Sequence, residues 1–158
     1  MNQIHEYPIN AMLEVLRSEY RRQGSEVEFW PFFYNAEYLP VALSSSAVFV
    51  NTADNDSDFA IFQTMQSAFN SVSGAFVATP NCTVRIVYDV SGRRLEDRDT
   101  HLLNIFGRGQ RPFWWPRPFV VRAKGSWSTT INNLDAAVAF NIRLTFSGVK
   151  VFRLPPRG

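Results

Sequence analysis

The stretch Val138-Ala-Phe-Asn-Ile-Arg-Leu-Thr-Phe146 indicates the fold class of this chain. Every second side chain in it is apolar, namely Val138, Phe140, Ile142, Leu144 and Phe146. The side chains between them are small or polar, so a strand made of these residues would bury one face and leave the other in water. We therefore expect a half-buried β-strand. The next pair, Ser147-Gly148, predicts a turn, after which residues 149–154 would return as another strand.

Shorter strand-like segments precede this one. Residues 27–34 are rich in aromatic side chains but contain Pro31, which favours an edge strand or a bend. Residues 47–50 and 59–62 flank the polar stretch 51–58 and predict a hairpin with a longer loop. Further strand candidates are residues 83–88, 119–124 and 127–131.

The composition agrees with a sheet protein. The chain has 158 residues, of which 46% are hydrophobic and 19% charged, and this is sufficient to bury a core. Its 14 phenylalanines suit strands, because aromatic side chains pack well on a pleated surface. About eight short strands separated by loops predict a mainly β fold, an antiparallel β-sandwich of jelly-roll type with a short N-terminal α-helix. Residues 1–24 would form the N-terminal arm and helix, and residues 25–158 the β-sandwich domain.

The N-terminal residues have a helical period. Residues 1–8 predict a short arm ending in Pro8, and Asn10 would cap a helix that runs to about Gln23 and stops at Gly24. Its apolar side chains lie along one stripe, which consists of Ile9, Met12, Leu13, Leu16 and Tyr20. A helix this short is marginal alone, so the stripe rests either on the sheet of the same chain or on a neighbouring subunit.

Residues 104–119 form the most unusual segment of the chain. They contain five aromatic residues, three prolines and three arginines within sixteen positions. Proline fixes φ and donates no backbone hydrogen bond, so the segment is unsuited to a helix or a central strand and predicts a stiff, extended loop. Its aromatic side chains either fold back over their own core or contact a partner, since stiff side chains lose little entropy on docking. The candidate contact residues are Arg108, Arg111, Phe113, Trp114, Trp115 and Arg117, with Met12, Leu16 and Tyr20 of the helix.

The titratable residues form no recognisable catalytic or metal site. His5 and His101 are the only histidines, and no nucleophile elbow accompanies them. Cys82 is the only cysteine and is expected to be a small buried apolar residue, so neither a disulfide within the chain nor a thiolate metal site is expected. Alternating aspartates in residues 54–58 imitate the start of a calcium loop, but the required glycine and glutamate are missing. We therefore expect a non-enzymatic protein without a cofactor or a metal.

Charge and hydropathy argue against nucleic acid and membrane as partners. The net charge of +2 is too small to favour nucleic acid. No apolar run approaches the length of a transmembrane helix, and the N-terminus lacks the pattern of a signal peptide. Exposed aromatic side chains on a sandwich leave a carbohydrate-binding or host-surface-binding module as a competing class of function.

The second half of the chain follows a recognisable order of motifs. These are, in sequence, Thr83-Val-Arg-Ile-Val-Tyr-Asp89, Ser91-Gly-Arg-Arg-Leu95, Asn104-Ile-Phe-Gly107, Pro112-Phe-Trp-Trp-Pro-Arg-Pro-Phe119 and Asn141-Ile-Arg-Leu-Thr-Phe-Ser-Gly-Val-Lys150. Over roughly residues 59–154, this order resembles the small structural proteins of tailed-bacteriophage virions.

The resemblance implies a β-sandwich subunit that assembles in many copies on a phage particle. The first expectation is a head decoration (cement) protein that stabilises the capsid lattice and is assembled, as a trimer, in the cytoplasm of the host bacterium. Its partners would be copies of itself and the major capsid protein or other virion proteins. A neck position and a tail accessory (adaptor) role are the alternatives on the particle.

Overall fold

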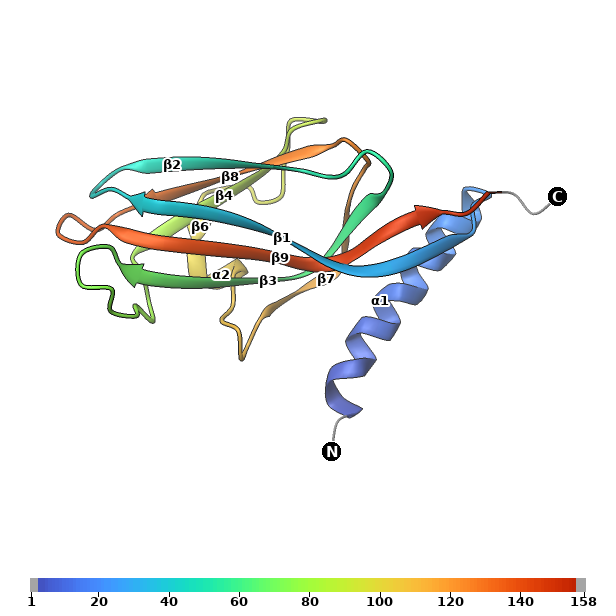
Figure 1. The fold of residues 1–158 in the computed structure, drawn as a ribbon, viewed down its shortest axis with the longest axis horizontal. Helices are drawn as coiled ribbons and strands as arrows, with labels where there is room; N and C mark the ends of the chain where they lie inside the picture. The colour runs from blue at the N-terminus through green and yellow to red at the C-terminus, as the bar shows by residue number, and fades with distance from the viewer. Residues whose placement is uncertain (1–2, 156–158) are drawn as a thin grey trace.

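Two antiparallel β-sheets lie face to face, and the helix α1 (Gln3–Arg22) packs on the outer face of one of them (Figure 1). The computed structural model describes the backbone of residues 3–155 and the side chains of residues 8–155. The four-stranded sheet contains, in spatial order, β1 (Val27–Val41), β9 (Phe140–Arg153), β3 (Asp58–Asn70) and β7 (Phe113–Val121). The five-stranded sheet contains β2 (Ser46–Thr52), β8 (Ser126–Asn133), β4 (Cys82–Tyr88) and β5 (Arg93–Arg94), with β6 (Thr100–His101) also paired to β4.

The strand order is that of a jelly roll. β1 pairs with β9, β2 with β8 and β3 with β7, so strands from the start of the fold pair with strands from its end. β4 completes the nesting by pairing with β5 and β6, which follow it directly. The predicted fold class, a mainly β antiparallel sandwich with an N-terminal helix, is confirmed, and the strands are wound in the jelly-roll order.

β9 joins the four-stranded sheet together, since it pairs with β1 on one side and with β3 on the other. The predicted alternation is confirmed, because the buried residues of its first half are Phe140, Ile142, Leu144 and Phe146. The turn predicted at Ser147-Gly148 is wrong, because β9 continues without a break to Arg153. Gly148 instead permits a close approach between strands: a Cβ built on it would lie 1.8 Å from the carbonyl oxygen of Ala60.

The hairpin predicted from residues 47–50 and 59–62 is also wrong. β2 and β3 lie in different sheets, and residues 53–57 carry the chain from one sheet to the other. Phe49 and Phe59 both face the core between the sheets, so this crossing lets each strand bury its apolar side. A polar stretch between two apolar runs predicts a change of direction, but it does not distinguish a hairpin from a crossing between sheets.

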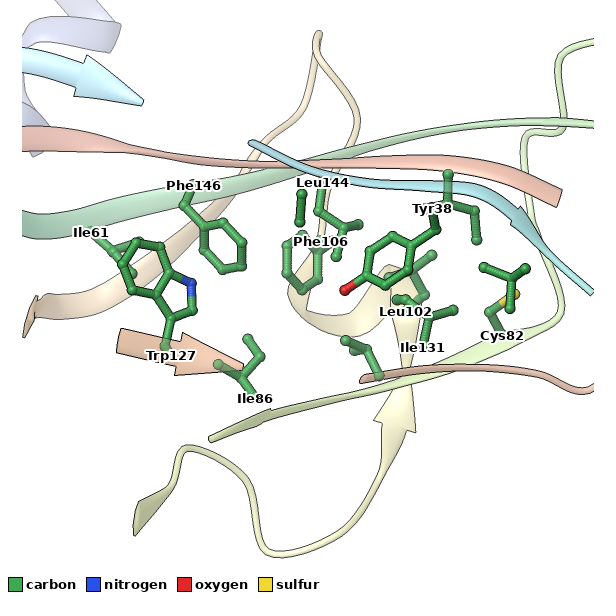
Figure 2. Close-up of a cluster of buried hydrophobic side chains, with 14 of the residues drawn as sticks. Tyr38, Ile61, Cys82, Ile86, Leu102, Phe106, Trp127, Ile131, Leu144 and Phe146 are labelled. Carbon is green, nitrogen blue, oxygen red and sulfur yellow. The ribbon is translucent and has the colours of Figure 1, made fainter. Parts of the chain in front are cut away.

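Aromatic rings fill the space between the sheets (Figure 2). The ring of Trp127 in β8 lies 5.5 Å from that of Phe146 in β9 and 6.0 Å from that of Phe59 in β3, measured between centroids. Phe106 follows the short helix α2 (Leu102–Ile105) and lies 5.5 Å from Phe146. Cys82 is fully buried in this core, as predicted, and burial raises the pKa of its thiol to about 12. The thiol is therefore protonated at neutral pH and is not a nucleophile.

The apolar stripe of α1 rests on the sheet of the same chain. Met12, Leu16 and Tyr20 are buried there. The surface beneath them is made by Ala60, Phe62, Val149 and Val151. Of the two alternatives for the stripe, the structure therefore shows packing within the subunit.

The start of α1 differs from the prediction, whereas its end agrees. Residues 3–8 are already helical, so the predicted arm and the cap at Asn10 are wrong, and residues 1 and 2 lie outside the described residues. Pro8 lies inside the helix, where it removes one backbone donor near the start without ending it. Gly24 follows the helix with a φ of +76°, as expected for the residue that stops it.

A buried carboxylate ties α1 to the sheet. Asp58, at the start of β3, accepts hydrogen bonds from the hydroxyl of Tyr20 at 2.5 Å and from the guanidinium of Arg122 at 2.9 Å. Its other oxygen accepts one from the backbone N–H of Ala123 at 2.8 Å. Burial acts to raise the pKa of Asp58, but these hydrogen bonds outweigh it, so the pKa is lowered. The charged carboxylate thus links α1, β3 and the loop between β7 and β8 at neutral pH.

Gly148→Ala is expected to lower the free energy of unfolding by about 3 kcal/mol, because the new methyl group would collide with the Ala60 carbonyl and push β9 away from β3. Gly109→Ala is the matched control, since nothing lies within 4 Å of a Cβ built there. Its expected effect is below about 0.5 kcal/mol. Urea unfolding measures both values, and equal stability of the two variants would contradict the close approach at Gly148.

Glu96, between β5 and β6, should make the free energy of unfolding depend on pH. Burial is the main influence on this carboxyl and raises the pKa of Glu96 to about 7, although the carboxylate accepts a hydrogen bond from the backbone N–H of Ile86. In the unfolded chain its pKa is about 4.3. Between these two values the folded state binds more protons, so the contribution of Glu96 to the free energy of unfolding should fall as pH rises from about 4.3 to about 7.

Glu96→Gln should therefore flatten the stability profile over this pH range, since the amide can still accept the hydrogen bond but does not titrate. Asp97→Asn is the control, because the side chain of Asp97 is 92% exposed and its replacement should leave the slope unchanged. Urea unfolding at a series of pH values gives the three profiles. A Glu96→Gln profile parallel to that of the unchanged protein would show that Glu96 titrates normally.

Candidate functional site

The segment 104–119 has three parts rather than one loop. It begins in α2, residues 108–111 form a tight turn, and residues 113–119 belong to β7. The prediction of an extended loop is therefore wrong for both ends, although β7 is an edge strand and not a central one. Pairing with β3 passes from Trp114 directly to Phe119, so the two prolines between them lie in a bulge that needs no ladder hydrogen bond.

The predicted contact residues of this segment divide into two groups. Trp114 packs with the cluster under α1, Trp115 packs on the core between the sheets, and Phe113 meets Trp115 edge-on with 5.7 Å between ring centroids. These aromatic side chains are half-buried by their own chain. The exposed candidates are Arg108, Arg111 and Arg117. The candidates in α1, which are Met12, Leu16 and Tyr20, are at most 9% exposed and leave a partner little surface to contact.

An exposed apolar surface that the sequence analysis did not assign lies along β1. Trp30, Phe32 and Phe33 are 58%, 36% and 63% exposed, and Phe152 of β9 lies 5.8 Å from Trp30 between ring centroids. We call these four residues the β1 ledge. The sequence contained a signal for it, because Phe29-Trp-Pro-Phe-Phe-Tyr34 places aromatic residues on both faces of an edge strand, and a core on one face accommodates only half of them.

The β1 ledge lies at the free edge of the four-stranded sheet, where β1 and β9 continue past the five-stranded sheet towards α1 (Figure 1). Lys150 lies over the ring of Phe32 at 3.8 Å and forms an ion pair with Asp54. The hydrogen bond from Lys150 lowers the pKa of Asp54, so the pair remains charged at neutral pH. An uncovered edge strand with aromatic side chains offers another chain both apolar surface and backbone hydrogen-bonding groups.

A pocket of about 630 Å³ lies beside the turn 108–111. Its walls are Gln66, Ser67, Phe76 and the turn itself. Two backbone hydrogen bonds close this turn, one from Arg108 N–H to the Arg111 carbonyl at 3.0 Å and one in the reverse direction at 2.8 Å. Gln66 is 5% exposed, and neither atom of its amide group has a hydrogen-bond partner among the described residues. An unpaired buried polar group costs about 1–3 kcal/mol, so this glutamine lowers the stability of the free subunit.

His101, Asp54 and Asp58 have structural roles. His101 caps α2, because its Nδ1 accepts a hydrogen bond from the backbone N–H of Leu103 at 3.4 Å. Of the alternating aspartates, Asp58 holds α1 and Asp54 pairs with Lys150, so these carboxylates serve different contacts. Within residues 8–155, no group of three or more His, Cys, Asp or Glu side chains is placed to hold a metal ion. In the same part of the chain, no helix is long and apolar enough to span a membrane.

Comparisons with known proteins assign no family to this chain. No family model matches it, and no curated protein matches it. Among solved structures it is similar to a chain in the structure of infectious bursal disease virus Gt strain, with 11% sequence identity and a TM-score of 0.28. The match covers 83% of this chain and 38% of the viral chain, so this chain spans well under half the length of that viral chain.

Trp115→Ala is expected to lower the free energy of unfolding by about 2–3 kcal/mol, because the indole packs on the core between the sheets. Phe33→Ala should change it by less than about 0.5 kcal/mol, because the Phe33 side chain is largely exposed. Urea unfolding of the two variants checks both values. If Trp115→Ala were as stable as Phe33→Ala, Trp115 would be a surface residue and free for partner contact.

Proposed function

We propose that this chain is a structural protein of a tailed-bacteriophage virion, and that it acts as a decoration (cement) protein that stabilises the head lattice through protein–protein contacts. The observation that carries this proposal is the β1 ledge, an exposed aromatic surface on the free edge of a jelly-roll sandwich. Two-sheet jelly rolls occur in viral capsid proteins, and also in lectins and cupins. The resemblance of residues 59–154 to phage virion proteins favours the first of these classes.

The β1 ledge suits assembly because its exposure is unfavourable for a free subunit. Soluble monomers rarely expose contiguous aromatic surface, and an open edge strand can pair with another chain. Covering each of Trp30, Phe32 and Phe33 would contribute on the order of 1–2 kcal/mol of apolar burial. Their stiffness adds to the gain, since little side-chain entropy is lost when they dock.

The two edges of the four-stranded sheet differ, and this difference supports a cyclic assembly. β1 carries the aromatic ledge, whereas β7 carries the exposed Arg117. A closed ring requires two different surfaces on each subunit, and guanidinium groups stack well on aromatic rings. In the proposal, a trimer of this chain contacts the major capsid protein or another virion protein, after assembly in the cytoplasm of the host bacterium. A neck or tail accessory position is the alternative on the particle.

Quantitative mass spectrometry of purified particles tests the proposal. Head decoration requires the chain in hundreds of copies per particle, because a lattice protein repeats with the capsid subunits, whereas a neck or tail position requires about a dozen. Absence of the chain from particles would contradict the virion role altogether.

Phe33→Ser should reduce the number of copies per particle about tenfold without unfolding the subunit, because it removes exposed apolar surface from the β1 ledge. Val72→Ser is the matched control, since Val72 is 94% exposed in the loop between β3 and β4, away from the ledge. The same mass-spectrometric count measures both variants. Equal loss of copies in both, or in neither, would show that the ledge does not make the contact.

A further inference from the structure

The pocket beside the turn 108–111 has a size and a lining that the proposed virion role does not require. Its volume of about 630 Å³ lies within the range of small-molecule sites, which is about 300–1,000 Å³. Gln66 and Ser67 come from β3, Phe76 from the segment after β3, and the remaining wall from the turn before β7. Three separate parts of the chain therefore meet around one hollow.

The charge of the pocket is positive and uncompensated. Arg108 and Arg111 both line it, and no aspartate or glutamate does. Among the described residues, neither guanidinium takes part in an ion pair, and the guanidinium of Arg108 donates one hydrogen bond, to the carbonyl oxygen of Ala78 at 2.7 Å. Guanidinium groups bind planar anions through paired hydrogen bonds, so this rim is complementary to a carboxylate.

The base of the pocket is polar and unsatisfied. The amide of Gln66 is buried with neither its donor nor its acceptor engaged by the described residues. An amide presents a donor and an acceptor side by side, and a hydroxyl group, which is both donor and acceptor, can meet either of them. Because Gln66 lines the pocket, a ligand in this hollow is the group placed to supply such a partner.

The remaining wall is an exposed aromatic ring. Phe76 is 57% exposed and is held edge-on against Phe69, with 5.8 Å between ring centroids. A fixed ring on a pocket wall gives a ligand a flat apolar surface to lie on. The pocket thus combines a flat apolar wall, a buried amide that can bind a hydroxyl group, and two guanidinium cations.

We propose that this pocket binds an acidic saccharide, a sugar ring that bears a carboxylate. The carboxylate would lie on Arg108 and Arg111, the ring on Phe76, and a ring hydroxyl on the amide of Gln66. A neutral sugar leaves both arginines without a counter-charge, and a bare anion leaves Gln66 and Phe76 without a contact. This binding activity goes beyond the proposed structural role, and it would give a particle that carries many copies a multivalent attachment to acidic polysaccharide.

Isothermal titration calorimetry of the full chain with galacturonic acid, and with galactose as the matched neutral sugar, tests the proposal. Galacturonate should bind with a Kd of about 1 mM, and galactose should bind at least about tenfold more weakly. Arg111→Gln should weaken galacturonate binding about tenfold. Arg98→Gln should leave it unchanged, because the Arg98 side chain is 88% exposed and lies outside the pocket.

Gln66→Met separates binding from folding. It should weaken galacturonate binding about fivefold while the stability of the subunit is kept or increased, because it removes a buried amide that has no partner. No binding of galacturonate, equal affinity for both sugars, or inorganic phosphate binding as tightly as galacturonate would overturn the proposal. So would a Gln66→Met variant that is less stable but binds galacturonate normally. The copy number per particle is unaffected by any of these results, so the virion role stands or falls separately.

Discussion

The strand β9 is the element on which the rest of the structure depends, because it serves two cores at once. Its even-numbered side chains, from Phe140 to Phe146, fill the space between the sheets, and its odd-numbered Val149 and Val151 support α1. It also pairs with β1 and β3 along nearly its whole length. Gly148 lies where the first role passes to the second and allows β3 to approach closely. A displacement of β9 would therefore disturb both cores together.

The same arrangement explains why one edge of the molecule stays apolar and open. The five-stranded sheet covers the inner face of β1 only over its second half, and α1 covers the outer face near Phe29. The aromatic side chains between these two covers, Trp30, Phe32 and Phe33, have no layer above them. The opposite edge, at β7, is closed by half-buried tryptophans and presents Arg117 instead. The subunit thus has two chemically different edges, which is the property that the proposed assembly uses.

Patterns in the sequence predicted the features that depend on neighbouring residues alone. The alternation in residues 138–146 predicted a strand with one buried face, Pro31 predicted an edge position, and Gly24 predicted the end of the helix. Each of these depends on side-chain period or on backbone conformation at a single residue. The sandwich class followed from the number and spacing of such strands.

Features that depend on distant pairing were not predictable in the same way. The pair Ser147-Gly148 is typical of a turn. In the structure, Gly148 is needed because β3 comes close to it at Ala60, which is far away in the sequence. The chain crosses between the sheets after β2 because β2 pairs with β8 and β3 pairs with β9. The sequence of residues 53–57 does not specify these partners. The pocket next to Gln66 is formed by three separate segments, so no local sequence motif predicts it. The β1 ledge was predictable in part. The sequence shows the surplus of aromatic residues in β1, but it does not show which of them are exposed.

If the β1 ledge is a contact surface in an assembled particle, hydrogen–deuterium exchange of β1 will differ between the particle and the free subunit. The backbone amides of residues 28–30, 32 and 33 should exchange about tenfold or more slowly in the particle than in the free subunit, while those of the exposed loop at residues 71–74 keep the same rate. Equal exchange of these amides in the two states would show that the β1 ledge stays uncovered in the particle.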